Sequence, residues 1–511
     1  MSSNTYSALL IDIGGKQDFI FSSNKLKENI GASYIIAHEL FGLILSASIQ
    51  EFGGEAAILE KWKTEINHTN LFKVNEKLAV GYIGGGNALL FFNGNKEEVI
   101  PFVQHYSYSV LQQFPGVQLG FGLIEDFNLD DWSTSLRRLN QSVDNNRSLN
   151  YLSATPFKHG IAADCPLSGE GQESFDNKLK WISKQSQIKI ESSTLAHEVF
   201  KSTYKDLLGT TLEVTNEIED LNDADEKGYI AIVHIDGNGM GQAFRDCNDL
   251  ASFRLLSMQV DEKLEASLLA LVSYTMELCK TDLDEGYQNI FTKNGKHYFP
   301  FRSIINAGDD ITFVCHGRLG IHLAEKYVEI LANPDIGNKK IASCAGVAIV
   351  NKKYPFFRAY KLAEKLAEKA KEKSRGVDSS ESYGAFINYH ISAGGYTGDF
   401  DELIKRKYKV GEQDMEHGPF ELLSKTSTNI LFKDVKKELY EMLYQPENKN
   451  KWPKNKLLAL RHVITSSRAE QEYFKLQMKA RNLEIKEELY DFPYYDMIDL
   501  IEFYPKQLLQ S

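Results

Sequence analysis

The order of apolar and polar segments along the chain predicts two copies of one βαββαβ unit. An apolar run at residues 7–11 ends at Asp12 and a glycine pair, and an apolar run from Tyr229 ends at Asp236 and Gly237. Each copy continues with a segment of helical apolar spacing, a hairpin, a second helix and a last strand. This order is that of a ferredoxin-like fold, an antiparallel sheet with helices on one face.

The distance between the two copies is constant, which indicates a duplication. Asp12 and Asp236 lie 224 positions apart. Three further pairs share this spacing to within one residue: Ser33 and Ser257, Gly85 and Gly308, and Gly122 and Gly346. Because the pairs fall in the same order on a helix, a hairpin and a strand, we interpret them as equivalent positions of one repeat.

Two further regions differ from the repeat in composition. A polar stretch that ends in the acidic run Glu217–Glu226 connects the units, and a helical, charged sequence follows Gly395. The predicted fold class is α+β, with two tandem ferredoxin-like domains and a C-terminal helical domain. We predict the first unit at 1–157, a connecting helical insertion at 158–227, the second unit at 228–398 and the helical domain at 399–511.

Charge and cysteine content narrow the class of protein. The net charge of −12 argues against a protein that coats nucleic acid, although a local basic groove remains compatible with it. The five cysteines form no CxxC pair, which argues against a disulfide framework or a zinc ribbon and favours a reducing cytoplasm. The longest apolar run noted, within Leu264–Cys279, is well below the ~20 residues of a membrane span. We therefore expect a soluble, cytoplasmic protein without membrane contact.

Three acidic residues of the second unit are predicted to form a metal site. Asp236 ends the first strand, and Asp309 and Asp310 lie at the tip of the hairpin that pairs with this strand. Mg²⁺ and Mn²⁺ prefer oxygen ligands, and a pair of such ions can hold both oxygens of a phosphoryl transfer. We predict these aspartates as catalytic metal ligands, together with the carbonyl of Ile235. The alternative is a solvated turn beside a helix cap.

A glycine-rich turn after Asp236 predicts a phosphate-binding segment. Gly237, Gly239 and Gly241 open a helix, where backbone N–H groups can bind a triphosphate. The alternative is a tight turn with no ligand. We predict nucleotide binding along this turn and at the hairpin by Gly237, Asn238, Gly239, Met240, Gly241 and Gly308.

The predicted helix Arg358–Arg375 carries lysines and glutamates at a spacing of three residues, which is typical of a solvated salt-bridge face. Lys371 is placed differently, because it adjoins the buried face near the C-terminal end of the helix. From there it can reach phosphates, although a solvated role is the alternative. His234, inside a buried strand, is interpreted as a hydrogen-bonded core residue.

The first unit lacks the acidic hairpin of the second. It keeps Asp12 but has Gly86 and Asn87 in place of the aspartate pair, so we predict that it does not hold a catalytic metal. Its three consecutive glycines leave room for a ligand beside the backbone. We predict a candidate second nucleotide pocket there, and a purely structural partner is the alternative. The residues of this candidate pocket are Gly84, Gly85, Gly86, Asn87 and Ser33.

Two motifs carry a resemblance to a known family: Asp236-Gly-Asn-Gly-Met-Gly and Ala307-Gly-Asp-Asp. Within a duplicated palm, they resemble the large polymerase/cyclase subunit of type III CRISPR effectors (the "Cas ten" family). The segments Asp12-Ile-Gly-Gly-Lys-Gln-Asp-Phe-Ile and Ala363–Lys371 are also similar to that family. The resemblance covers about residues 5–400, and the two units would be its palm domains.

The resemblance implies a nucleotidyltransferase that makes cyclic oligoadenylates from ATP, with Mg²⁺ or Mn²⁺ as cofactor. It implies Asp236, Asp309 and Asp310 as metal ligands, Lys371 as a triphosphate ligand and Ser257 as a nucleobase contact. Its partners would be ATP or another nucleoside triphosphate, and crRNA with CRISPR effector subunits, or a second copy of the chain. The chain departs from the family in Ala307 and Asn238, and in lacking an N-terminal HD nuclease domain. The cysteine pairs between the palms are reduced to Cys165, so we predict no intact zinc site.

Two other functions compete with the cyclic oligoadenylate hypothesis. One is a non-catalytic palm scaffold of an RNA-guided type III complex, which would have no need to keep the three aspartates and Lys371. The other is a dinucleotide cyclase of the GGDEF type. Against that, position 310 is Asp where GGDEF has Glu, and both palms lie in one chain.

Overall fold

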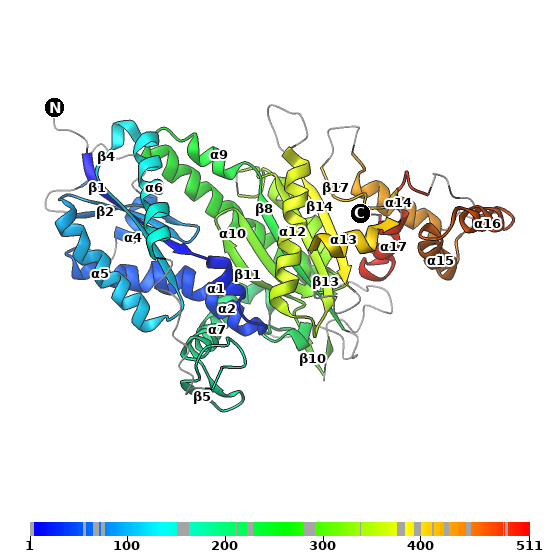
Figure 1. Cartoon of the computed structure of the whole chain (residues 1–511), viewed down its shortest axis with the longest axis horizontal. Helices are drawn as coiled ribbons and strands as arrows, with labels where there is room; N and C mark the ends of the chain where they lie inside the picture. Colours follow the sequence, from blue (N-terminus) through cyan, green and yellow to red (C-terminus); the bar gives the residue numbers. More distant parts are fainter. Residues whose placement is uncertain are drawn as a thin grey trace.

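The computed structural model places two sheets side by side, with a group of helices at one end (Figure 1). This arrangement confirms the α+β fold class. The structure describes residues 5–54, 58–64, 71–72, 77–150, 163–209, 212–221, 228–280, 292–293, 295–337, 339–375, 384–392, 400–410, 413–423, 429–445, 451–483, 485 and 489–510.

The first sheet has four strands in the order β2-β3-β1-β4, and all neighbours are antiparallel. Its strands are β1 (Thr5–Gly14), β2 (Leu78–Gly84), β3 (Asn87–Phe92) and β4 (Gln118–Asn128). Between β1 and β2 lie α1 (Lys16–Phe21), α2 (Leu26–Tyr34), the π-helix η1 (Ile35–Ile44), α3 (Leu45–Glu51) and α4 (Ile58–Thr64). The helix α5 (Lys96–Gln113) joins β3 to β4, and η2 (Leu129–Asp131) and α6 (Trp132–Asn150) follow. The predicted βαββαβ order is confirmed.

The second sheet repeats this order in its first four strands, β11-β12-β8-β13, and adds β14 and β17. The repeated strands are β8 (Tyr229–Gly237), β11 (Phe301–Ala307), β12 (Asp310–His316) and β13 (Ser343–Asn351). The helices of this unit are α9 (Met240–Arg245), α10 (Leu250–Lys280) and α11 (Gly320–Ala332). Both units therefore have the ferredoxin-like strand order that the repeat predicts.

Helices cover both faces of the second sheet, whereas the sequence predicts one covered face. After β13, α12 (Phe356–Arg375) crosses over to β14 (Phe386–Ser392), which pairs with β13 in parallel. In β8, Val233 packs in the core that includes α10 and α11, whereas Ile232 packs in the core that includes α12. Consecutive side chains of a strand point to opposite faces, so a continuously apolar strand requires cover on both.

The two ferredoxin-like units, called the first and second palm below after the family that they resemble, contact each other through equivalent helices. The helix α10 of the second palm packs against β2 of the first, and α2 of the first palm packs against β11 of the second. Arg254 of α10 is buried and donates hydrogen bonds to the carbonyls of Val80 and Gly81, at an irregularity in the β2–β3 register. These bonds join α10 of the second palm to the backbone of β2 at the point where the β2–β3 register shifts.

The connecting insertion contains the predicted helices and also small strands. Its elements are β5 (Ser174–Asp176), β6 (Lys180–Ile182), α7 (Lys184–Thr203), α8 (Lys205–Leu208), β7 (Leu212–Glu213) and η3 (Ile218–Leu221). β7 forms a three-stranded sheet with β9 (Thr292–Lys293) and β10 (Lys296–Tyr298).

The C-terminal helices share a core with the second palm. They are α13 (Phe400–Tyr408), α14 (Phe432–Leu443), α15 (Lys454–Ile464), α16 (Arg468–Lys479), α17 (Tyr494–Phe503) and η4 (Lys506–Leu508). The short strands are β15 (Lys409–Val410), β16 (Gln413–Asp414) and β17 (Phe420–Glu421), and β17 pairs with β14 of the palm. The predicted boundaries after residues 157, 227 and 398 lie outside the described residues.

One helical stretch, Leu26–Glu51, is long and apolar enough to cross a membrane by length and composition alone. Half of its most apolar window is buried in the protein, and side chains such as Ile35 and Leu45 belong to the core of the first palm.

Candidate functional site

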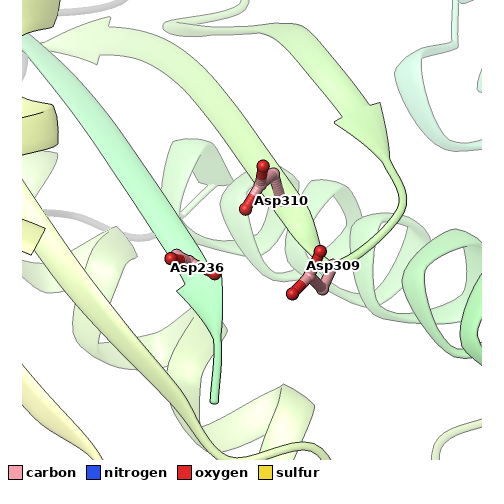
Figure 2. Close-up of side chains that lie close together, drawn as sticks. All are labelled: Asp236, Asp309 and Asp310. Atoms are coloured by element: carbon pink, nitrogen blue, oxygen red, sulfur yellow. The ribbon is translucent and has the colours of Figure 1, made fainter. Parts of the chain in front are cut away.

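The two strands β8 and β12 bring the three predicted carboxylates together (Figure 2). Asp236 and Asp310 are directly opposite in the antiparallel register, and Asp309 precedes Asp310 at the hairpin tip. One ligand oxygen from each carboxylate lies within 4.8 Å of the others. The antiparallel register fixes Asp310 as the residue beside Asp236, because a slip of one residue would turn Asp310 to the other face of the sheet.

Mutual repulsion makes this cluster a good cation site. Burial raises the pKa of Asp309, and the Asp236 carboxylate raises it further. Burial, Asp309 and Asp236 together hold the pKa of Asp310 well above its usual range, and Lys371 acts in the opposite direction. Three crowded carboxylate oxygens fit the preference of Mg²⁺ or Mn²⁺ for hard oxygen ligands. Ile235 lies in β8 directly before Asp236, and the role of its carbonyl stays a prediction.

A divalent cation is therefore expected to raise the Tm of the protein. At about a hundredfold excess over its Kd, a ligand contributes ~2.7 kcal/mol, a shift on the order of 2–4 °C. Asp309 and Asp310 hold protons more tightly in the folded chain than in the unfolded chain, so their contribution to stability falls as the pH rises. Mg²⁺ competes with those protons, so its shift should be larger at pH 8 than at pH 6. Thermal melts with Mg²⁺ or EDTA at both pH values measure this, and an equal shift with Asp309→Ala/Asp310→Ala protein would contradict it.

Lys371 lies at the carboxylate cluster. Its Nζ donates a hydrogen bond of 2.5 Å to Asp236 Oδ2. Other lysines of α12 behave as the salt-bridge pattern predicts: Lys365, for example, is half-exposed and pairs with Glu368 at 2.9 Å. The solvated alternative therefore holds for part of α12 but not for Lys371.

The glycine-rich turn is held by bonds within the protein at its first two residues. The N–H of Gly237 donates to the Asp309 carbonyl, and the N–H of Asn238 donates to the Ala342 carbonyl. The buried Asn238 side chain donates to Ser374 Oγ at 3.1 Å and to the Gly384 carbonyl at 2.9 Å. The backbone N–H groups of Gly237 and Asn238 are thus already used. The predicted triphosphate contacts in this turn are left to Gly239, Met240 and Gly241, at the start of α9.

The two hairpin tips meet, and this contact combines residues that the sequence assigned to separate sites. Gly85 and Gly308 both have positive φ, of 59° and 70°, and a Cβ on Gly308 would lie 3.6 Å from the Gly85 Cα. A Cβ on Gly84 would lie 3.3 Å from Ser257 Oγ. The first-palm glycines therefore adjoin Ser257 of the second palm. Ser33, which was predicted to share a pocket with these glycines, lies in α2, and α2 packs on α7 and β11.

At the position equivalent to the carboxylate cluster of the second palm, the first palm has an arginine side chain. Asp12 is opposite Asn87 in the β1–β3 register, as Asp236 is opposite Asp310. Arg147 of α6 forms an ion pair with Asp12. Arg147 and Lys371 are 224 positions apart, so the basic residue is also part of the repeat. With one carboxylate neutralised by a guanidinium and an amide in place of the second acid, these residues do not fit a divalent metal.

Lys16 is a residue of the site that sequence reasoning missed. Its Nζ donates a 2.5 Å hydrogen bond to the Gly85 carbonyl, and a Cβ on Gly86 would lie 2.8 Å from its Cδ. Burial lowers the pKa of Lys16, while the nearby Asp310 and Asp309 act to raise it. Lys16 thus brings a positive charge from the first palm to the acidic cluster of the second. The equivalent position of the second unit, 224 residues further on, is Met240, so the repeat does not predict a basic residue at position 16.

His234 behaves as predicted, because its buried ring bonds Thr312 Oγ1 at 2.9 Å.

Comparison with known proteins finds a family model that matches the part of the chain holding this site. Residues 229–379, which hold all three aspartates and Lys371, match the family model described as Cas10/Cmr2, second palm domain. This segment of the chain is similar to a Cas10/Cmr2 second palm domain. The match confirms the resemblance to the Cas10 family. A comparison with curated proteins found no match.

Several solved structures share the fold of this chain over nearly its whole length. A Csm1–Csm4 cassette in complex with pppApApA has a TM-score of 0.55 at 11% identity, over 99% of this chain and 69% of that one. Csm1 of T. onnurineus has a TM-score of 0.51 at 10% identity, over 99% and 69%. An apo Csm1–Csm4 cassette has a TM-score of 0.51 at 11% identity, over 100% of this chain and 71% of that one.

Proposed function

We propose that this chain is a metal-dependent nucleotidyltransferase that makes cyclic oligonucleotides, specifically cyclic oligoadenylates from ATP, as second messengers in prokaryotic antiviral defence. The observation that carries the proposal is the cluster of Asp236, Asp309 and Asp310 with Lys371 bonded to it. Acidic oxygens for a cation and a lysine for phosphate are the components of phosphoryl transfer. A purely structural palm gains nothing from three carboxylates that repel one another.

In the proposed reaction, the 3′-hydroxyl of one nucleotide attacks the α-phosphorus of the next. The new P–O bond forms as the bond to the bridging oxygen breaks, pyrophosphate leaves and the hydroxyl proton passes to solvent. The three aspartates would hold Mg²⁺ or Mn²⁺, which supplies charge stabilisation at the phosphoryl oxygens when bound. Lys371 exchanges its bond with Asp236 for one with the triphosphate.

The choice of adenine nucleotides and of partners rests on the proteins of similar fold. Csm1–Csm4 cassettes with a TM-score of 0.51 have been solved in complex with one ATP and with cA3. We extend this to the present chain as ATP binding and as assembly with CRISPR effector subunits and crRNA in the cytoplasm. Assembly with a second copy of the chain is the alternative arrangement.

Product analysis tests the proposal directly. The purified full chain is incubated with each nucleoside triphosphate and Mg²⁺ or Mn²⁺, with and without RNA, and products are resolved by chromatography and mass spectrometry. A cyclic product from ATP with release of pyrophosphate supports the proposal. If no triphosphate is consumed under any of these conditions, the scaffold function replaces it.

Lys16→Met is expected to reduce the rate of product formation about tenfold. The substitution keeps most of the aliphatic chain over Gly86 but removes the charge near Asp309 and Asp310 and the bond to the Gly85 carbonyl. One lost charge-assisted hydrogen bond of ~1.5 kcal/mol corresponds to this factor. Initial rates at saturating ATP measure it. Lys361→Met, which removes a lysine 3.8 Å from Asp18 on the neighbouring α1, is the control and should retain the wild-type rate.

A further inference from the structure

The connecting insertion contains two short turns whose sequence spacing is that of a zinc ribbon. Cys165 and Ser168 are separated by two residues, and so are Ser183 and Ser186. The β5–β6 hairpin lies between the two turns. Zinc ribbons place four cysteines at this spacing, on two turns that flank a hairpin. The pattern is therefore a ribbon in which serine occupies three of the four ligand positions.

The four side chains form one hydrogen-bonded cluster. Ser168 Oγ and Ser183 Oγ lie 2.9 Å apart, and the Cys165 thiol donates to Ser186 Oγ at 3.9 Å. Cys165, Ser183 and Ser186 are each at most 2% exposed. Burial raises the pKa of the Cys165 thiol, but hydrogen bonds from the backbone N–H groups of Ser168, Ser183 and Leu167 outweigh it and lower the pKa. Backbone donors converging on a buried sulfur also surround the ligand sulfurs of metal centres, where they tune the metal.

These residues do not fit zinc, although the resemblance to the Cas10 family implies a zinc site here. Structural zinc is held by four deprotonated thiolates or imidazoles, and a neutral hydroxyl is a poor substitute. Here the hydroxyls are also engaged with one another. We propose that residues 165–186 form a zinc-ribbon-like unit that folds without metal, because a cluster of one thiol and three hydroxyls takes the place of the ion.

The same cluster anchors the insertion to the first palm. Ser186 Oγ donates to Glu28 Oε2 at 3.1 Å, across the contact of α7 with α2. One turn further along α7, the buried Lys189 Nζ donates to the Phe19 carbonyl at 2.7 Å and to Ser22 Oγ at 3.0 Å. Phe19 and Lys16 belong to the same short helix α1. The helix α7, which begins within this unit, thus supports the helix α1 that carries Lys16 to the carboxylate cluster.

The first test is the metal content and chelator response of the full chain. Wild-type protein purified from zinc-supplemented cells is expected to contain no stoichiometric zinc, and its Tm in EDTA-treated, Mg²⁺-free buffer should not fall on adding a zinc chelator. Exposed Trp181 lies on β6, whereas Trp62, Trp132 and Trp452 are buried, so quenching of tryptophan fluorescence by iodide reports on this hairpin. One zinc per chain, with a chelator-induced rise in quenching, would overturn the proposal.

The second test restores the ribbon. Ser168→Cys/Ser183→Cys/Ser186→Cys protein is expected to bind one more Co²⁺ per chain than the wild type, with the visible absorption of a tetrahedral thiolate site. Adding Cys165→Ser should abolish most of that absorption, and the wild type controls for the other four cysteines. A triple variant with wild-type melting that shows no tetrahedral Co²⁺ spectrum would refute the ribbon geometry. Because the first test uses wild-type protein, a misfolded variant leaves the proposal testable.

Discussion

Product formation by Asp309→Ala/Asp310→Ala protein is expected to fall at least ~10³-fold below the wild type. The two carboxylates supply most of the oxygen ligands of the candidate site, and a metal ion contributes several kcal/mol of charge stabilisation in phosphoryl transfer. The same variant should melt no lower than the metal-free wild type, because the charges it loses are repelled by Asp236 in a largely buried site. Product analysis and thermal melts in EDTA measure the two effects.

An inactive variant with a raised or unchanged Tm separates loss of chemistry from loss of fold. Asp18→Ala is a matched control, since Asp18 is an exposed aspartate on α1 outside the cluster. Product at the wild-type rate from the double variant would show that the nucleotidyltransferase activity lies elsewhere or in a contaminant, and it would remove the basis of the proposed function.

Lys371→Met is expected to lower kcat/KM for ATP by about 10- to 100-fold, the second largest effect. A desolvated lysine beside a phosphate makes a charge-assisted bond of ~1.5–3 kcal/mol, and methionine keeps the length of the side chain without the charge. The variant should also bind Mg²⁺ no more weakly than the wild type, because the lysine competes with the cation for Asp236. Steady-state kinetics and metal titration monitored by thermal melts provide the measurements.

The same helix supplies a matched control for this variant. Lys365→Met makes an identical change at a half-exposed lysine whose partner is Glu368, and surface pairs of this kind contribute little. It should leave kcat/KM unchanged. Equal losses from both variants would indicate that the charge of α12 as a whole matters and would contradict a specific role for Lys371.

The repeat and the acidic cluster could be predicted from sequence because both depend on local order. A strand that ends at Asp236 and a hairpin that carries Asp309 and Asp310 must meet once the βαββαβ order is recognised. The position of Lys371 could be predicted for the same reason, because its helix α12 follows the last strand of the unit and packs on β8 and β13. Each of these inferences needs only the connectivity inside one unit.

Contacts between the two units were beyond the same reasoning. The bond of Lys16 to Gly85 and the approach of Gly84 to Ser257 depend on how the palms are docked, which no periodicity encodes. The alternation of apolar and polar residues does not predict that the Asn238 side chain is buried. Its hydrogen-bond partners Ser374 and Gly384 come from segments more than a hundred residues away. The serines at positions 168, 183 and 186 carry no metal-ligand signal in the sequence, because a hydroxyl is not a zinc ligand and only Cys165 matches the cysteine pattern.

The contact between the two hairpin tips has a consequence for the substitutions that the first palm tolerates. Gly85 of the first palm contacts Gly308, which directly precedes Asp309 and Asp310, and both glycines have positive φ. A side chain at either glycine would be strained by the positive φ of its own backbone, and its Cβ would lie in van der Waals contact with the other hairpin. We therefore expect a substitution at Gly85, in the first palm, to alter the position of the hairpin that carries Asp309 and Asp310 in the second.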